Sequence, residues 1–182
     1  MSDYMGSMSW ASRWDDVSPL PRGVDAPTEE QIMEDGKWRA SLAGDFLVIE
    51  AKAGVHDEKN AIWYKLVLQG HGEIADEYKQ YAEAFYWVPL DEIEKGGSFG
   101  QKKGRFIADL AINSFNLLTP EETKGLSGEE VHEKLAGVFE NLTGQVVTTA
   151  LKWSAYVNKD GELKGPYMDL GRTSKSKVEP PF

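Results

Sequence analysis

The chain has 182 residues, 41% of them hydrophobic and 27% charged, which is enough for one domain with a real core and tails. It has no cysteine, which excludes disulfides, thiol catalysis and cysteine-ligated zinc. The net charge of −10 argues against nucleic acid when taken over the whole chain. No apolar run is long enough to span a membrane and no signal pattern opens the chain, so we expect a cytoplasmic protein without membrane contacts.

The negative charge is unevenly distributed. Residues 1–36 carry eight acidic and two basic side chains, and residues 71–98 and 119–141 are also acidic. Acidic loops commonly keep a protein soluble, and that explanation covers most of these residues. The segments predicted to form strands are neutral to basic, so a nucleic-acid surface on the strands stays compatible with the charge.

The N-terminal region, residues 1–35, is predicted to be an acidic arm. Residues 1–27 mix Ser, Gly, Asp and Pro with isolated aromatic residues, a composition typical of a disordered or loosely docked segment. Thr28-Glu29-Glu30-Gln31 is a capping box, which predicts a short helix to about Glu34.

Three strands are predicted after the arm. The first is divided by a bend or bulge at Ala43-Gly44 into residues 37–42 and 45–53, with Leu47, Ile49 and Ala51 on one face. The second and third, residues 61–69 and 81–89, alternate between apolar and mixed positions.

A helical insert is predicted over residues 104–143. A flexible Gly-rich loop, residues 96–100, leads to it, and apolar residues then recur at helical spacing up to Leu118. Capping boxes open two further helices at Thr119 and Ser127. The last helix is expected to bury Val131, Leu135, Val138, Phe139 and Leu142 and to leave His132 solvated.

Two more strands are predicted in residues 145–157 and 162–170, joined by the hairpin turn Asn158-Lys159-Asp160-Gly161, and residues 172–182 are expected to be a flexible tail. The fold class is therefore mainly β with a helical insert (α+β). We expect residues 36–171 to form a five-stranded OB-like barrel with helices between strands three and four. A small β-sandwich with a helical insertion and another α+β roll remain alternatives.

Aromatic and basic residues are interleaved along the predicted strands, as single-stranded nucleic acid requires: each stacked base contributes roughly 1–3 kcal/mol, and cations contact phosphates. The best pair is Trp63 and Lys65, which share the face opposite Ile62 and Leu66. Alternatively these aromatic residues fill the core, and alternation turns about half of them inward. The residues predicted to bind nucleic acid are Trp38, Arg39, Lys52, Trp63, Lys65, Phe85, Trp87, Lys102, Lys103, Arg105, Lys152, Trp153 and Tyr156.

Other motifs carry less chemistry. Lys102, Lys103 and Arg105 follow the Gly-rich loop and form either a mobile phosphate clamp or a solvated linker. The run His56-Asp57-Glu58 contains metal-ligand types, but three adjacent polar residues usually form only a loop. No catalytic triad, Walker loop or dinucleotide fingerprint is present, so we expect no catalytic residues, no metal and no cofactor.

Residues 36–171 resemble small phage-encoded OB-fold single-stranded DNA-binding proteins. The resemblance is carried by the first hairpin (residues 37–69), the end of the insert (Leu135–Gly144) and the Asn158–Glu162 hairpin. It implies a non-enzymatic protein that coats replication or recombination intermediates in the host bacterial cytoplasm. A phage structural or protein-interaction module is the alternative, and a metal-dependent nuclease is a third hypothesis.

The tip Pro180-Pro181-Phe182 resembles the Ile-Pro-Phe tip with which bacterial single-stranded DNA-binding proteins dock replication partners. Two prolines stiffen the peptide and lower the cost of ordering it on a partner. The tip is therefore predicted to bind replication or recombination proteins; the alternative is that it packs on its own barrel. Homo-oligomerisation stays open.

Overall fold

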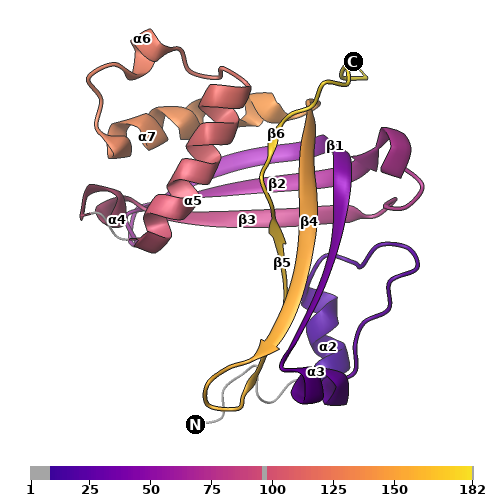
Figure 1. Cartoon of the computed structure of the whole chain (residues 1–182). Helices are drawn as coiled ribbons and strands as arrows, with labels where there is room; N and C mark the ends of the chain where they lie inside the picture. The colour runs from indigo at the N-terminus through magenta and orange to yellow at the C-terminus, as the bar shows by residue number, and fades with distance from the viewer. Residues whose placement is uncertain (1–8, 96–97, 182) are drawn as a thin grey trace.

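The computed structural model describes residues 9–95 and 98–181. Over this range the chain forms a mainly antiparallel β-sheet with several helices, an α+β fold in which the sheet does not close (Figure 1). The strand order is β3-β2-β1-β4-β5, and the short β6 pairs with β4. The strands are β1 (Lys37–His56), β2 (Ala61–His71), β3 (Tyr81–Pro89), β4 (Val146–Val157), β5 (Leu163–Leu170) and β6 (Ser174–Lys175).

Strand β1 belongs to both halves of the sheet. Its first half pairs with β4, from Lys37 opposite Tyr156 to Leu47 opposite Val146. Its second half pairs with β2 up to His56. In Figure 1, β1 bends from the direction of β4 into that of β2 and β3. One strand thus joins a β3–β2–β1 half to a β1–β4–β5 half.

The bend predicted at Ala43-Gly44 is wrong, because both residues pair with β4. Gly44 instead makes room for a neighbour: a Cβ there would lie 3.0 Å from the side chain of Ile74. A glycine in a strand therefore marks a close approach here and not an interruption.

The irregularity of β1 lies further along, between Val48 and Glu50, where the register with β2 shifts. A bulge adds one residue to its strand and so changes which positions face inward. Phe46 and Val48 are buried before it and Ala51 after it. The predicted grouping of Ala51 with Leu47 on one face therefore fails.

Strands β2 and β3 follow the predicted alternation. The buried positions are Ile62, Tyr64, Leu66, Leu68, Ala82, Ala84, Tyr86 and Val88. The alternate positions, which include Trp63, Lys65, Phe85 and Trp87, are half-buried or exposed, except that Ala61 at the start of β2 is also buried. The outer side of this strand pair therefore keeps its aromatic residues within reach of a ligand.

The helical insert lies between β3 and β4, as predicted, but begins earlier. It comprises α4 (Leu90–Lys95), α5 (Ser98–Ala108), the π-helix η3 (Asp109–Ser114), α6 (Pro120–Thr123), α7 (Gly128–Val138) and the 3₁₀-helix η4 (Phe139–Leu142). The capping boxes at Thr119 and Ser127 are confirmed. Ser98 to Gly104, predicted as the end of a flexible loop and a linker, belong to α5.

His132 is buried, so its predicted solvation is wrong. It lies on α7 with Leu135 and is followed by buried Phe139 and Leu142, a helical spacing that packs one face onto β2. Nδ1 of His132 lies 2.7 Å from the Tyr64 hydroxyl. Burial lowers the pKa of His132 to about 4 and raises that of Tyr64 above its ordinary range.

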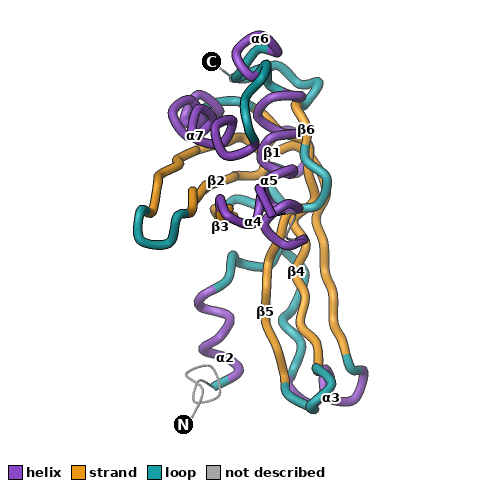
Figure 2. The backbone as a smooth tube through the Cα atoms, turned by 90° about the vertical axis from the view of Figure 1, so that its left-hand side faces the viewer, coloured by secondary structure: helices purple, strands orange, loops and turns teal. Residues whose placement is uncertain are grey.

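The described part of the arm, residues 9–27, is folded against the sheet and is not loose. It contains α2 (Trp10–Arg13) and the 3₁₀-helix η1 (Trp14–Asp16), and α3 (Glu29–Asp35) follows with the predicted capping box at Thr28. Trp14 packs edge-on against Trp38 at 5.4 Å between ring centroids. Figure 2 shows α2 beside the half of the sheet that contains β5.

The tail, expected to be flexible from residue 172, is docked as far as Ser176. Thr173 is buried and its hydroxyl lies 2.6 Å from that of Thr149. The Ser176 hydroxyl donates to Asp45 at 2.8 Å, and β6 extends the sheet beside β4. Sequence alone missed these contacts because short polar residues are also typical of disorder.

No helix in the described ranges is both long and apolar enough to cross a membrane.

Candidate nucleic-acid interface

The outer side of β2 and β3 carries a cluster of aromatic rings. Trp63 stacks on Phe85 with centroids 5.8 Å apart and an interplanar angle of 13°. Phe85 meets Trp87 edge-on at 5.9 Å. These three residues, with the charged neighbours Glu50, Lys52, Lys65 and Glu83, are called the aromatic face below.

The rings are held in place by the strands around them. Trp63 lies opposite Gly54 of β1, where a Cβ would come within 2.6 Å of the indole. The absence of a side chain at Gly54 therefore leaves space for the indole of Trp63. Phe85, on the neighbouring strand β3, stacks on the same indole. Phe85 is 48% exposed and presents the most accessible ring.

The predicted cations on this face are paired with acids. Glu50 contacts Lys52 at 2.6 Å and Lys65 at 3.7 Å, and Lys65 also lies 3.8 Å from Glu83. The hydrogen bond from Lys52 lowers the pKa of Glu50 and raises that of Lys52. Exposed pairs of this kind are weak and exchangeable, so phosphate can compete for the lysines.

Two contributors escaped the sequence analysis. Lys59, in the β1–β2 turn, places its ammonium 5.1 Å from the Trp87 ring centroid, and His56 meets the same ring edge-on at 5.4 Å. The shortness of the connection between residues 56 and 61 was the available signal. A tight hairpin turn brings its own side chains beside those at the strand ends.

The other half of the sheet carries a second cluster, called the basic face below: Lys37, Arg39, Lys152, Tyr156 and Tyr167. The register aligns them on one side of β1, β4 and β5. Lys37 lies opposite Tyr156, and Arg39 is opposite Ser154, which in turn faces Tyr167. They surround a shallow groove of about 950 Å³, lined by all of them except Tyr167.

Charge on the basic face is arranged differently. Lys37, Arg39 and Lys152 form no ion pair within the described residues, and Asp169 is the one acid along the groove there. Tyr156 and Tyr167 are 43% and 46% exposed, with ring centroids 6.2 Å apart. Asp169 lies opposite Lys152 in the pairing of β4 with β5, so this face offers a net positive charge, and not a neutral one, beside two accessible rings.

Two predicted tryptophans are not on either face. Trp153 is 1% exposed and its Nε1 donates to the carbonyl of Ser18, so its assignment to base stacking is wrong. Trp38 is half-buried against Trp14 of the arm and points to the same inner side. Trp38 precedes the outward-facing Arg39, and Trp153 follows the outward-facing Lys152, so both tryptophans point inward. The pairing of β1 with β4 determines which residues share a side of the sheet.

Lys102, Lys103 and Arg105 lie on α5 and not in a loop, so the mobile clamp is wrong. Lys102 and Arg105 border a separate groove of about 510 Å³ with Phe106 and Asp109. Its lining shares no residue with the groove of the basic face. The structure thus brings the predicted residues together in three places and not one.

Two further features considered from the sequence are the metal-ligand types at residues 56–58 and the C-terminal tip. Within the described residues, no three His, Asp or Glu side chains converge as a metal site. Pro180 is half-buried and Pro181 exposed, and Phe182 lies outside the described residues.

Comparison of this chain with protein-family models, curated proteins and solved structures finds no match.

Proposed function

We propose that this protein binds single-stranded DNA without catalysing its turnover, and that bases stack on the aromatic face. The observation that carries the proposal is the outward ring cluster of Trp63, Phe85 and Trp87, with the Lys59 ammonium beside it. Flat rings accept any base, and neighbouring cations accept the backbone. Phe85 is 48% exposed and therefore does not belong to the hydrophobic core.

The architecture supports the same proposal. An OB-fold binds oligonucleotides on the face of its strands 2 and 3 and on adjoining loops. Here β1 pairs with both β2 and β4, a helical insert from α4 to η4 lies between β3 and β4, and the aromatic rings are on β2 and β3. We take the sheet as an OB-type barrel that is open between β3 and β5. By its resemblance, the protein would coat phage replication or recombination intermediates in the host cytoplasm.

The test is binding of a fluorescently labelled oligo-dT, followed by anisotropy and by quenching of tryptophan fluorescence. Phe85→Ala should weaken binding by about 1–3 kcal/mol because it removes a stacking ring. Its melting temperature should stay near that of the wild type, since exposed side chains contribute little to stability. Phe85→Tyr should retain affinity and Phe85→Leu should not, because only the former keeps a π face.

Met33→Ala is the matched control, because Met33 is 50% exposed but lies on α3. Wild-type protein that neither changes the anisotropy of the oligonucleotide nor loses fluorescence would overturn the proposal and favour a protein-interaction module. Loss of the oligonucleotide only with Mg²⁺ would indicate a nuclease.

The tip remains part of the proposal as a docking peptide for replication or recombination proteins. Its support is that Val178, at 43%, and Pro181 are exposed beyond the docked Ser176. Removal of residues 180–182 should leave oligo-dT affinity and melting temperature unchanged and abolish capture of a purified single-stranded DNA-dependent partner. A lower melting temperature would instead mean that the tip packs on its own domain.

A further inference from the structure

The aromatic face and the basic face meet at the open side of the sheet. A groove of about 540 Å³ lies between the edge strands β3 and β5, and it is called the seam groove below. Phe85 of the aromatic face and Tyr167 of the basic face both line it. Tyr167 in turn contacts Tyr156, which lines the groove beside Lys37 and Arg39.

Exposed rings therefore continue across the seam. Phe85, Tyr167 and Tyr156 are each between 43% and 48% exposed, although they come from three different strands. Isolated exposed aromatic residues are common, but a connected series along one groove system is a feature of ligand surfaces. The series begins at the Trp63–Phe85 stack and ends among the unpaired cations of the basic face.

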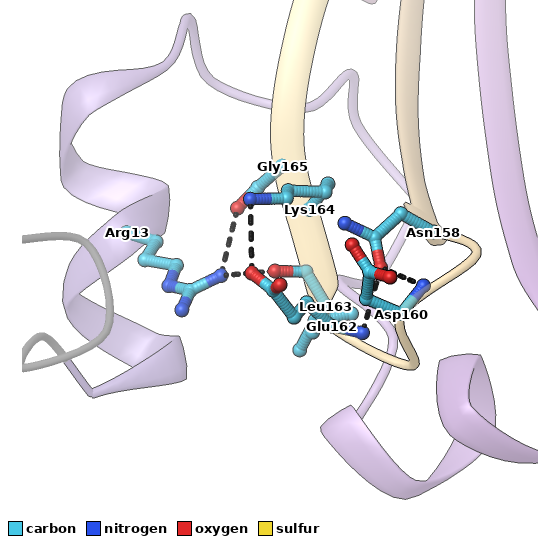
Figure 3. A network of polar contacts seen from close by, with 7 residues as sticks. All are labelled: Arg13, Asn158, Asp160, Glu162, Leu163, Lys164 and Gly165. Atoms are coloured by element: carbon cyan, nitrogen blue, oxygen red, sulfur yellow. Dashed lines mark hydrogen bonds and ion pairs between the residues drawn. The ribbon is translucent and has the colours of Figure 1, made fainter. Parts of the chain in front are cut away.

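The arm fixes the two edges of the seam. The Ser18 hydroxyl accepts a hydrogen bond from the backbone of Glu83 on β3, and the Ser18 carbonyl accepts one from Trp153. Arg13 donates to the carbonyls of Leu163 and Gly165 on β5 (Figure 3). Contacts to both edges hold β3 and β5 in a defined relation, which a continuous path requires.

We propose that a single strand of DNA bound at the aromatic face crosses the seam groove and continues over β5, β4 and β1 onto the basic face. There Lys37, Arg39 and Lys152 hold its phosphates, and Tyr167 and Tyr156 support bases on the way. This proposal rests on the proposed function and extends it: the aromatic face supplies stacking and the basic face supplies phosphate contacts.

The arm places negative charge at the crossing. Asp15 and Asp16 line the seam groove together with Glu83. Acids beside a phosphate path weaken binding unless the strand contributes enough contacts elsewhere. Short strands confined to the aromatic face do not reach Asp15 and Asp16, whereas long strands pass them and offset the repulsion by reaching the three cations.

The experiment compares oligo-dT of about 5 and about 15 nucleotides, which span the usual site sizes of one OB-type domain. The wild type should bind the longer strand at least about tenfold more tightly, because the second set of contacts becomes intramolecular. The triple variant Lys37→Gln/Arg39→Gln/Lys152→Gln should lose that gain and keep its affinity for the short strand. Its salt slope for the long strand should fall by about 2, at about 0.7 per phosphate.

The matched control is Lys124→Gln/Lys134→Gln/Lys177→Gln, which removes the same charge from exposed positions on the insert and the tail. Asp15→Asn/Asp16→Asn should tighten binding of the long strand by about threefold and leave the short strand unchanged. Glu29→Gln/Glu30→Gln on α3 is its control. Equal losses for both lengths in the basic-face variant, or no loss, would overturn the path. Wild-type protein that binds neither length would overturn the proposed function itself.

Discussion

The aromatic face and the basic face occupy the outer side of the same sheet but differ in charge pairing: the lysines of the first form ion pairs and, in the described part of the chain, the cations of the second do not. On the aromatic face Lys52 and Lys65 are matched by Glu50 and Glu83. On the basic face Lys37, Arg39 and Lys152 have no such partners among the described residues. A region can therefore be suited to bases through its rings or to phosphates through its cations, and composition alone does not say which.

The net charge of −10 shows why that distinction matters. Averaged over the chain, the charge argues against a polyanionic ligand. Locally, the acids lie on the arm, the insert and the aromatic face, while the basic face stays positive. The local arrangement of charge governs contacts at short range, because salt screens charges beyond about 10 Å.

The largest effect is expected beneath the basic face. Trp153→Ala should lower the free energy of unfolding by about 3–5 kcal/mol, because it empties a buried site and removes the hydrogen bond to Ser18. Tyr156→Ala, on the opposite side of the same strand, should cost little stability and weaken binding of long oligo-dT instead. Urea unfolding and anisotropy measure the two effects. A stable Trp153→Ala protein with weakened DNA binding would reverse the assignment of sides.

A pH effect of intermediate size is expected beneath the aromatic face, where His132 contacts Tyr64. The pKa of His132 is about 4 when folded and 6.5 ordinarily, so the unfolded chain binds a proton first as pH falls. Stability from this residue is therefore full above pH 6.5 and is lost between about pH 6.5 and 4, by up to about 3 kcal/mol.

His132→Gln isolates that contribution, because it keeps a polar side chain that does not titrate. Unfolding free energies measured by urea at pH 7.5 and 5 should differ less in the variant than in the wild type. Identical pH dependence in both proteins would mean that other groups cause the acid sensitivity.

The smallest effect is expected from Glu50, the acid that pairs with both lysines of the aromatic face. Glu50→Gln should release Lys52, leave Lys65 with Glu83 as its one acidic partner among the described residues, and make the aromatic face more like the basic face. Affinity for short oligo-dT should rise by about threefold at low salt and less at high salt. Glu140→Gln on η4 removes the same charge from an exposed position and should have no such effect. An unchanged affinity would show that these lysines do not approach the strand.

Some of this could be read from the sequence, because local patterns specify it. The alternation of β2 and β3 and the capping boxes at Thr28, Thr119 and Ser127 all depend on neighbours within a few residues. The partition of rings on β2 and β3 followed directly. It placed Trp63 with Lys65 on one face of β2 and Phe85 with Trp87 on one face of β3, and the strand pairing then joined the two sets.

What failed depends on partners distant in sequence. The bulge beside Val48 is set by the pairing with β2, and the burial of His132 by Tyr64, which lies 68 positions away. Trp153 is inside because the arm covers that side of β4. The division of the cations into separate faces likewise requires the strand register, which one sequence does not display.

The docking of the tail up to Ser176 limits how far its last described residues can travel. From Ser176 to Pro181 a fully extended chain spans about 17 Å. The anchor sits beside Val147 at the start of β4, about 30 Å along the strand from Tyr156. Figure 1 shows this end of the chain at the opposite end of β4 from the β4–β5 turn. The tail is thus a short tether, and a molecule recruited by residues 177–181 would lie next to η3, clear of the basic face.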